Sequence, residues 1–497
     1  MGKFVQELTS FMQQKGFVWG PEPEIYGGQA GFYSYAPLGK LLKNNVENTI
    51  RNVFIKNDFF EVECPTIMPK KVWEASGHLG GFTDPVIYSK KGAAFRVDNL
   101  IEEHFRLKDE NCPRLGGLKD DDYLDIIKKH DIKPNGEELD LKKGILRHDL
   151  MMKTTVGFDG EAYNRPETAT TTYLPFLRYY DFFRKKLPLG VFQIGNAYRN
   201  EISPRQHLIR TREFTQAEAQ LFIFKHQKKD YPKFDAVKNE KLPLWSWDKQ
   251  SKGQKIEMIS LKDAIDKKSL ANKAYAYLLH MTYNLFLELQ IPANKIRLVQ
   301  HSPDEKAFYA EDAWDIEVDL RSFGWTEICG IHDRSDYDLT QHAKFSGANM
   351  EVLDENNEKQ IPNILEIAFG TGRIVFALLD IYYEKKSEGE GKSMFKIPAK
   401  MAPMKAAVFP LLRKPELIKL AKKVYDDLNS CLLCKYDETA SIGKRYLRAA
   451  EEGIPYVVTI DFDSLEDQTV TVRNRDTEKQ ERININDVKN KLFSLIN

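Results

Sequence analysis

Residues 198–218 form a polar, proline-containing segment whose residue types suit phosphate binding. The segment lies between two strand-like apolar runs, residues 191–194 and 214–224, and the pattern predicts an antiparallel hairpin with cations at its mouth. Four arginines supply the charge: Arg199, Arg205, Arg210 and Arg212. A planar guanidinium holds phosphate or carboxylate through two parallel hydrogen bonds, and the aromatic ring of Phe214 offers a face for a purine base. We therefore expect a nucleotide site that has no glycine-rich loop.

A further arginine follows a glycine pair late in the chain. Residues 363–369 have an apolar strand pattern, Gly370 and Gly372 let the backbone approach a ligand closely, and an apolar helix pattern follows. Arg373 is in the first turn of that helix, where a cation opposes the helix macrodipole and an anionic ligand would remove the conflict. Together with Arg199 it could stabilise the charge that builds when a carboxylate attacks an α-phosphate. The alternative for Arg199 is a surface ion pair with Glu201.

Two acidic residues, Glu327 and Glu366, each stand in an apolar strand pattern, where an unpaired carboxylate would be costly. Mg²⁺ binds carboxylate oxygens together with phosphates, so these residues are candidate ligands for a magnesium ion that accompanies a nucleotide. The alternative for each is a buried ion pair with an arginine.

The composition excludes several classes of protein. Lys+Arg and Asp+Glu both number 73 in 497 residues, so any nucleic acid must be bound by local basic patches rather than by a global field. Five cysteines argue against a disulfide framework, and the pair Cys431 and Cys434 lacks the second pair that a zinc site requires. With no signal peptide and no apolar run long enough to span a membrane, we expect a cytoplasmic protein.

The chain divides into two parts by its pattern. Residues 1–395 mix helix and strand signals and contain polar or helical insertions at about 105–155 and 225–305, the second with Lys-rich and Trp-containing loops before a helical pattern at 270–289. Residues 387–393 have linker composition. Strand patterns at 408–412, 456–462 and 469–473 then alternate with helix patterns at 415–428, 442–452 and 486–496, which predicts a small α/β domain over 396–497.

These motifs occur together in one known family. Arg199-Asn-Glu201 with Arg210-x-x-x-Phe214 resembles motif 2 of the class II aminoacyl-tRNA synthetases, and Gly370-x-Gly-Arg373 resembles their motif 3. The chain is most similar to the dimeric glycyl-tRNA synthetases, through segments 24–28, 73–84, 95–98, 165–169, 315–317, 330–339, 441–446 and 453–461. The resemblance implies an α+β fold, with a class II antiparallel sheet flanked by helices and a C-terminal α/β anticodon-binding domain.

The resemblance also implies a reaction. Glycine and ATP would give glycyl-adenylate, and the glycyl group would then pass to the 3′ end of tRNA(Gly), with Arg199, Arg373 and Glu327 as catalytic residues and Mg²⁺ as a cofactor. Arg199 and Phe214 are expected at opposite ends of the adenylate. ATP contacts are implied at Arg199, Asn200, Glu201, Ile209, Arg210, Thr211, Arg212, Glu213, Phe214, Glu327, Ile328, Gly370, Thr371, Gly372 and Arg373.

The implied glycine contacts are Arg96, Glu167, Phe214, Thr215, Gln216, Ala217, Glu218, Glu366, Ile367, Ala368, Phe369 and Gly370. Among them Glu167, Glu218 and Glu366 resemble the carboxylates that hold the ammonium group of glycine. A small acidic pocket favours a cation and leaves no volume for a side chain. The chain departs from the family at Ala368, where a serine is usual, and at Gln220, where an acid is usual.

Pro65 matches the motif 1 proline at the class II dimer interface, so the resemblance also implies a homodimer. Two other functions fit parts of the pattern. Another class II synthetase would share motifs 2 and 3 but not segments 73–78 and 165–169. A non-catalytic nucleic-acid-binding paralogue would keep the fold but has no need of the full set of arginines and glutamates.

Overall fold

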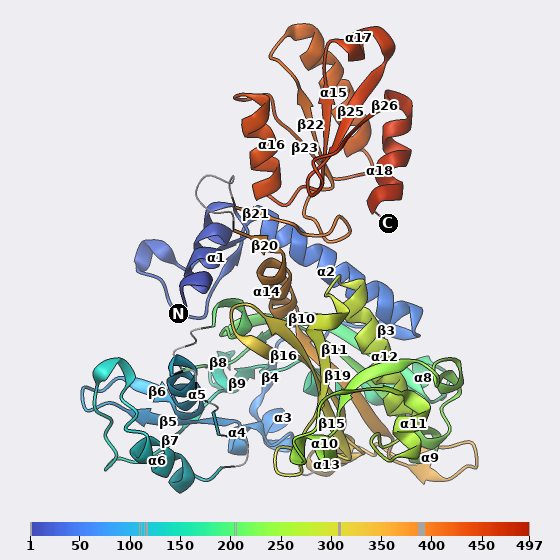
Figure 1. The fold of residues 1–497 in the computed structure, drawn as a ribbon. Coiled ribbons are helices and arrows are strands. Elements are labelled where there is room, and N and C mark those ends of the chain that lie inside the picture. Colours follow the sequence, from blue (N-terminus) through green and yellow to red (C-terminus); the bar gives the residue numbers. More distant parts are fainter. Residues whose placement is uncertain are drawn as a thin grey trace.

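A large, mainly antiparallel sheet forms the centre of the computed structural model, which describes residues 2–108, 110, 112, 113, 115, 118–202, 204, 206–306, 310–385 and 393–496. Within these residues the sheet has nine strands in the order β13-β12-β14-β15-β16-β19-β11-β10-β3 (Figure 1). Only β10 with β3 and β12 with β14 run parallel. In sheet order the bounds are Glu257–Ser260, Lys241–Trp245, Ile296–Gln300, Asp312–Leu320, Gly324–Asp333, Asn363–Gly370, Glu213–Ile223, Leu189–Tyr198 and Phe59–Glu61.

Three helices cover one face of this sheet: α2 (Pro37–Lys56), α12 (Lys273–Glu288) and α14 (Thr371–Tyr382). Their apolar sides and the sheet form the largest core, which includes Phe54, Leu278, Val375 and Ile367. Side chains alternate between the faces of a strand, so the opposite face is free for polar groups. Part of that face is covered by α7 (Ala169–Tyr173), α8 (Phe176–Phe182) and α13 (Tyr337–Ser346), which pack on Leu189 and Phe222.

The expected hairpin and the expected strand–turn–helix are both present. Strand β10 pairs antiparallel with β11, so the motif 2 segment joins two neighbouring strands near the centre of the sheet. Strand β19 pairs with β11 and leads directly into α14, in which Arg373 is the third residue. The two arginine motifs therefore come from adjacent strands.

The segment 105–155, expected to be helical, contains one helix of substantial length and two strands among its described residues. Helix α6 (Asp120–Lys129) is followed by β7 (Leu146–Asp149) and β8 (Met152–Val156). Strand β7 pairs with β5 (Thr83–Tyr88), and β8 pairs with β9 (Gly160–Asn164). These strands form two small sheets, β6-β5-β7 and β4-β9-β8, with β6 at Ala94–Arg96, β4 at Ile67–Pro69 and helices α3 (Lys70–Ala75), α4 (His78–Gly81) and α5 (Val97–Leu107) beside them.

The second insertion also differs from its expectation. The helical pattern at 270–289 corresponds to α12, but the lysine- and tryptophan-containing stretch before it forms strands β12 and β13, which extend the central sheet beyond β14. The short helix α10 (Trp247–Ser251) connects β12 to β13, while α9 (Lys225–Lys229) precedes β12 and α11 (Leu261–Asp266) follows β13. This insertion is therefore part of the central sheet and not a separate unit.

The C-terminal part has its own core and its own sheet, of order β23-β22-β24-β25-β26. The strands span Cys434–Tyr436, Ala406–Pro410, Tyr456–Ile460, Thr469–Asn474 and Gln480–Asn484, and the helices α15 to α18 span Pro415–Asn429, Ile442–Glu451, Asp463–Asp467 and Val488–Ile496. This confirms the strands and helices expected beyond residue 405. Residues 387–392 of the expected linker lie outside the described residues.

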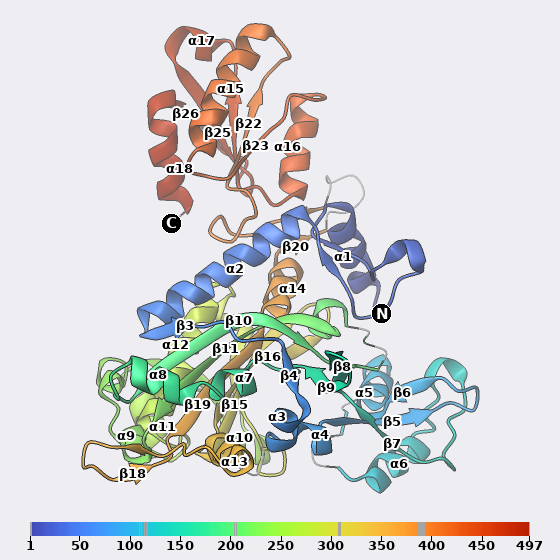
Figure 2. The same ribbon diagram turned by 180° about the vertical axis from the view of Figure 1, so that it is seen from behind.

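This C-terminal part stands over one end of the molecule, beside α1 (Lys3–Gln14) and the start of α2 (Figures 1 and 2). Lys15 Nζ lies 2.7 Å from a carboxylate oxygen of Glu451, and Asn45 donates to the carbonyls of Met401 and Ala402 at 3.1 and 2.9 Å.

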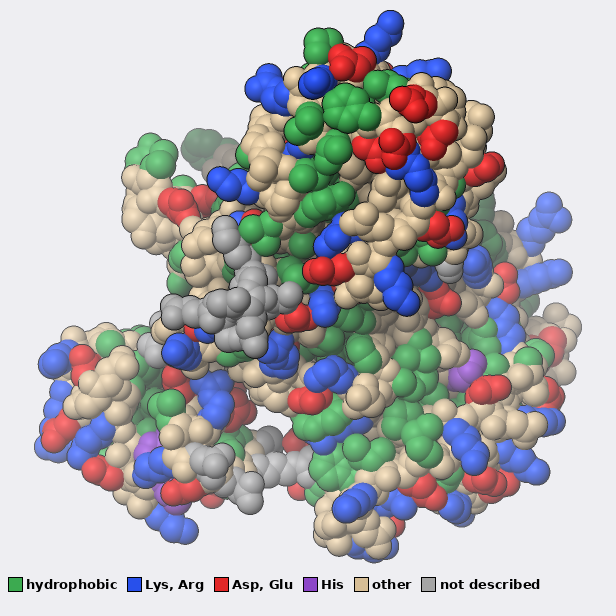
Figure 3. All heavy atoms as spheres, turned by 45° about the horizontal axis from the view of Figure 1, so that its top comes forward, with side chains coloured by type: hydrophobic (Ala, Val, Ile, Leu, Met, Phe, Trp, Pro, Cys, Tyr) green, Lys and Arg blue, Asp and Glu red, His purple; other side chains and the backbone are tan. Residues whose placement is uncertain are grey.

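Acidic and basic side chains are mixed on the face shown in Figure 3, in keeping with the zero net charge of the chain. Every helix in the described ranges is too short or too polar to traverse a bilayer. Short two-stranded sheets pair β1 (Val18–Trp19) with β2 (Ser34–Tyr35), β17 (Val352–Leu353) with β18 (Lys359–Gln360), and β20 (Tyr383–Glu384) with β21 (Met394–Phe395).

Candidate active site

A cleft with a cavity volume of about 240 Å³ lies on the open face of the central sheet, over β11, β19 and β16. Seventeen of the residues expected in the site line it: Glu167, Arg199, Glu201, Ile209, Arg210, Thr211, Phe214, Gln216, Glu218, Glu327, Ile328, Glu366, Ala368, Phe369, Gly370, Gly372 and Arg373. The lining also includes Tyr35, Leu208, Gly330, His332 and Arg334, which the sequence did not single out.

The floor of the cleft is built from cross-strand rows. Glu218 stands opposite Ala368, and Ala368 stands opposite Gly330 on the next strand. Directly opposed residues of an antiparallel pair share a face, so these three form one row of the floor. Because two of the three are alanine and glycine, the middle of the floor is low. The neighbouring row consists of Gln220, Glu366 and His332.

Three carboxylates converge at this end of the cleft: Glu167, Glu218 and Glu366. Burial and the neighbouring charges of Glu366 and Glu167 raise the pKa of Glu218 well above its usual range. Burial would also raise the pKa of Glu366, but Arg334 and His332 lower it to about 2. For Glu167 burial is again opposed, chiefly by His78, and the pKa falls. The surroundings of Glu366 and Glu167 therefore favour the charged carboxylates, whereas those of Glu218 disfavour its charged form.

Buried polar neighbours hold two of the carboxylates in place. Glu218 accepts a hydrogen bond from Thr168 Oγ1 at 2.5 Å and another from Gln216 Nε2. Glu366 accepts from the Tyr173 hydroxyl at 2.5 Å and from Gln220 Nε2 at 3.3 Å. Gln220, which stands where the family usually has an acid, thus anchors Glu366 in this chain.

Arg334 is the main cation of the acidic end. Its Nη1 lies 3.2 Å from Glu366 Oε1, and its Nε and Nη2 bind the Asp338 carboxylate at 2.7 and 2.9 Å. His332 Nδ1 is 3.3 Å from Glu366 Oε1. The only signal for either residue was the segment 330–339, which matched the family as a block. The spacing of Arg334 and Asp338 gives no hint of Glu366, because that partner comes from another strand.

Three further arginines line the cleft: Arg199, Arg210 and Arg373. Arg199 donates from Nε to the Pro166 carbonyl at 3.0 Å, and its guanidinium carbon is 5.3 Å from the ring centroids of both Phe82 and Phe214. It has no ion pair with Glu201 among the described residues, which removes the surface-pair alternative. Arg199 and Phe214 are therefore close to each other, and their places at opposite ends of an adenylate stay a prediction.

Glu201 has other partners. It is buried, and its Oε2 lies 3.4 Å from Arg96 Nη1 and 3.7 Å from Arg210 Nε. A buried carboxylate between two guanidiniums holds both side chains in position. Glu201 therefore orients Arg210, whose Nη1 also donates to Asn99 Oδ1 at 2.7 Å.

A bulge in β16 turns Glu327 into the cleft. Ile316 pairs with Cys329 but Glu317 pairs with Glu327, so Ile328 is an extra residue in β16. Bulges of this kind re-aim side chains and are common beside active sites. Glu327 then meets Arg373, whose Nη1 lies 2.9 Å from the Glu327 carbonyl and 3.3 Å from Oε1.

The pairing register corrects the expected magnesium site. His332, not Glu327, stands opposite Glu366, and Glu327 is five residues away along β16. At about 3.3 Å per residue the two positions are about 16 Å apart, too far to share an ion. Glu366 is also fully occupied by Arg334, His332, Tyr173 and Gln220. The residue opposite Glu327 is Glu317, whose carboxylate binds Arg297 at 2.6 Å.

Eight expected site residues do not line the cleft: Arg96, Asn200, Arg212, Glu213, Thr215, Ala217, Ile367 and Thr371. Strand alternation explains several of them, since Thr215, Ala217 and Ile367 point to the helical face, where Lys43 Nζ contacts Thr215 Oγ1 at 2.6 Å. Arg212 instead binds the carbonyls of Glu201 and Ala30 at 2.9 and 3.0 Å. Arg205 lies outside the described residues.

Comparison with known proteins gives relatives over the whole length. The chain is 38% identical to a glycine–tRNA ligase of Pyrococcus abyssi, with 98% of each chain covered, and 36% identical to that of Methanocaldococcus jannaschii, with 97% of each covered. Residues 405–495 match the family described as an anticodon binding domain. Among solved structures, the fold is similar to a Giardia lamblia prolyl-tRNA synthetase in complex with prolyl-adenylate, with a TM-score of 0.61, 15% identity, and 98% of this chain and 74% of that chain covered.

Proposed function

Because the chain belongs to the glycine–tRNA ligase family, we propose that its cleft activates glycine with ATP and passes the glycyl group to tRNA(Gly). The observation that carries this assignment of the cleft is its polarity. Arg210 and Arg373 line the part of the cleft away from the three carboxylates, which lie over a floor of alanine and glycine. Arg199, whose charge acts on Glu167, lies closer to them. This arrangement suits phosphates at one end and a small ammonium compound at the other.

In the first step an oxygen of the glycine carboxylate attacks the α-phosphorus of ATP. A new C–O–P linkage forms, the bond to the β-phosphate oxygen breaks, and pyrophosphate leaves. Arg199 stabilises the charge on the α-phosphate and the incoming carboxylate, and Arg373 holds the departing phosphates. Phe214 provides the apolar surface for the base. The arginines are held in advance by Pro166, Ile209 and Glu327, so little rearrangement is needed during the reaction.

The acidic end selects glycine by charge and by volume. The glycine ammonium group would sit among Glu167, Glu218 and Glu366, and its positive charge would lower the raised pKa of Glu218. Ala368 and Gly330 leave a shallow space beneath the α-carbon. A larger amino acid would have to overlap these groups, which discriminates more strongly than a pocket merely lacking a methylene contact.

Magnesium belongs to the cationic end of this scheme. At the bulge of β16 only Glu327 lines the cleft, since Glu317 is bound to Arg297; together with nucleotide phosphates the Glu327 carboxylate offers the oxygen ligands that Mg²⁺ prefers. Bound there, the ion would neutralise charge on the leaving pyrophosphate. Glu366 is not part of this site.

In the second step the terminal ribose hydroxyl of tRNA attacks the glycyl carbonyl, an ester forms and AMP leaves. We assign the catalytic domain to residues 1–395 and tRNA anticodon binding to 396–497, a division supported by the separate apolar core of the C-terminal part. The protein would act in the cytoplasm, where its tRNA is used.

We further propose a homodimer that forms through the β3 edge of the central sheet. Strand β3 is the last in the sheet order, and beside it Phe60 and Phe182 are 51% and 78% exposed. An unpaired edge with exposed aromatic rings favours association with another chain. Sedimentation should show a dimer that Phe60→Asp converts to a monomer; a wild-type monomer at micromolar concentration would contradict this.

The test of the main proposal is glycine-dependent ATP–pyrophosphate exchange. Arg199→Ala should lower the exchange rate by about 10²–10³, as expected for loss of one preorganised charge stabiliser. Arg448→Ala is the control, because this arginine lies in the C-terminal part and exchange needs no tRNA. Exchange equally fast with alanine or serine would contradict glycine selection, and unchanged exchange in Arg199→Ala would contradict the role of the arginine.

A further inference from the structure

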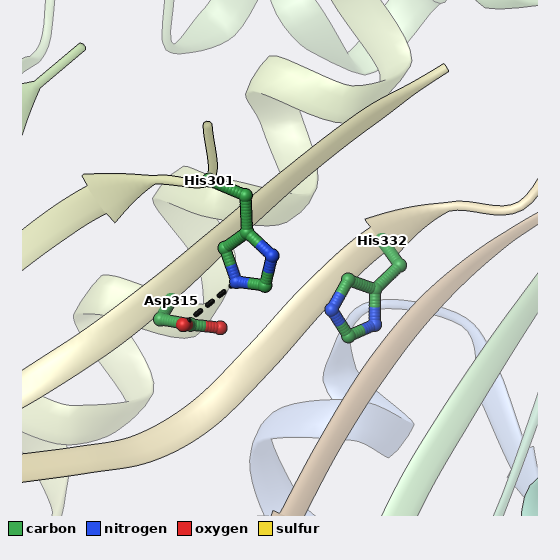
Figure 4. Close-up of side chains that lie close together, drawn as sticks. All are labelled: His301, Asp315 and His332. Atoms are coloured by element: carbon green, nitrogen blue, oxygen red, sulfur yellow. Dashed lines mark hydrogen bonds and ion pairs between the residues drawn. The ribbon is translucent and has the colours of Figure 1, made fainter. Parts of the chain in front are cut away.

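Two histidines and an aspartate form a compact cluster at one side of the cleft floor (Figure 4). His301 directly follows β14, Asp315 is on β15 and His332 is on β16. One nitrogen or oxygen of each residue lies within 4.8 Å of the others, and His301 Nε2 is 2.8 Å from Asp315 Oδ2. The three strands are neighbours in the sheet, so the backbone holds these side chains together independently of any ligand.

The His332 ring is oriented for coordination. Its Nδ1 faces Glu366 Oε1 at 3.3 Å, which leaves Nε2 directed toward the other two residues (Figure 4). A carboxylate on the remote nitrogen fixes the tautomer and raises the basicity of the nitrogen that binds a metal. Glu366 is itself buried and tied to Arg334 and Tyr173, so this orientation is firmly set.

Gly330 keeps the space between the groups open. A Cβ at position 330 would lie 3.2 Å from His332 Nε2 and 3.5 Å from Asp315 Oδ1, so both atoms border the volume that glycine leaves free. The same Cβ would lie only 2.8 Å from His332 Cε1. A side chain here would push the imidazole away from the carboxylate.

We propose that His301, Asp315 and His332 bind one divalent transition-metal ion, with Zn²⁺ preferred, through His301 Nε2, an Asp315 oxygen and His332 Nε2. Two imidazoles and one carboxylate are a known zinc ligand set, and three protein ligands leave a fourth position for water. The imidazoles make the site unsuitable for Mg²⁺, which prefers oxygen ligands. The exposed fractions of the side chains, 24%, 17% and 27%, leave a path for the ion to enter.

This site shares no residue with the magnesium site proposed at Glu327, although both histidines act electrostatically on Glu327. The described residues contain one other cluster of this kind, formed by His226, Asp354 and Glu355 on the surface. In that cluster His226 and Glu355 are exposed, and its single histidine makes it a weaker zinc site. It provides a matched control.

The experiment is a zinc titration of the tag-free full-length protein after removal of metal by a chelator, with a chromophoric chelator as competitor. The background should carry both Cys112→Ser and Cys431→Ser, because these two thiols are exposed and thiols bind zinc. We expect one zinc per chain, and a loss of affinity of about 100-fold or more in His301→Asn and in His332→Gln. His226→Ala should bind zinc as its parent does.

A second measurement separates loss of a ligand from loss of folding. Zinc should raise the melting temperature of the parent protein but not that of the two histidine variants, whose circular dichroism should match the parent. Absence of zinc binding at about 100 µM, or binding that neither variant weakens, would overturn the proposal. Glycine-dependent exchange reports separately on the proposed function, so one proposal can fail without the other.

Discussion

Replacing Arg334 with glutamine should weaken glycine binding and destabilise the fold together. The Arg334 side chain is 12% exposed and lies 3.2 Å from Glu366, which is 4% exposed. Glutamine keeps a polar side chain but no charge, so the carboxylate would lose its strongest cationic partner while the charges of its acidic neighbours remain.

The size of the effect follows from the pKa of Glu366. Burial raises this pKa, but Arg334, with His332, brings it from the ordinary 4.5 down to about 2. That difference corresponds to about 3 kcal/mol favouring the charged form, or about a 100-fold change in an equilibrium constant. Because the folded pKa is depressed, the stabilisation is present above pH 4.5 and is lost as the pH falls through about 2. In Arg334→Gln much of this stabilisation of the folded state would already be missing at neutral pH.

The assay is glycine-dependent ATP–pyrophosphate exchange from about pH 6 to pH 9, together with urea denaturation. We expect the KM for glycine to rise by about 100-fold at neutral pH and to fall again as the pH increases, since Glu366 in the variant must first lose a proton. The free energy of unfolding should fall by about 3 kcal/mol.

A matched control is Arg475→Gln. This guanidinium is also buried and donates to the carbonyls of Gly453 and Ile397 at 2.9 and 3.0 Å, far from the cleft. It should lower stability without changing the KM for glycine. A glycine KM within about twofold of wild type in Arg334→Gln, with an unchanged pH profile, would refute the electrostatic reasoning.

Three further substitutions test other parts of the structure. Burial lowers the pKa of His207 from 6.5 to about 4, so the unfolded chain binds a proton that the folded chain refuses, and stability should fall by up to about 3 kcal/mol as the pH drops through this range. His207→Asn, which tolerates the φ of 52°, should remove that dependence in urea denaturation; equal slopes in both proteins would contradict it. In Gly39→Ala the new Cβ would overlap the Phe17 carbonyl oxygen and should cost about 1–3 kcal/mol, whereas Gly443→Ala, with nothing within 4 Å, should be neutral or slightly stabilising. A loss below about 0.5 kcal/mol at position 39 would show that the helix shifts freely. Ala368→Val should raise the KM for glycine at least about tenfold while leaving the KM for ATP unchanged, and equal changes in both constants would show that the floor does not separate the two substrates.

Local periodicity was sufficient to predict the segments that carry the motifs. The hairpin of β10 and β11 and the strand–turn–helix around Arg373 are continuous apolar patterns with clear turn residues, so each could be recognised without its neighbours. The same holds for the alternating elements of the C-terminal part. By contrast β12 and β13 are short, contain Lys241 and Pro243, and owe their strand conformation to pairing with each other and with β14.

The site was predicted least well where its groups depend on cross-strand partners. The family resemblance implies that every residue of 214–218 and 366–370 contacts glycine. Strand alternation nevertheless directs Thr215, Ala217 and Ile367 to the helical face of the sheet. Arg334 could not be found from spacing, because its partner Glu366 is 32 residues away and meets it only through the register of β16 and β19. The β16 bulge that presents Glu327 has no sequence signature of its own.

The low middle of the floor has a consequence for evolution. Ala368 and Gly330 face each other across β19 and β16. Larger residues at either position would fill the floor of the cleft and could not widen the range of substrates. Position 330 is not free to vary, because any Cβ there meets the His332 ring at 2.8 Å, and His332 in turn orients toward Glu366. A change at one position therefore alters the fitness effect of changes at the others. Such epistasis would make a narrow substrate choice easy to keep.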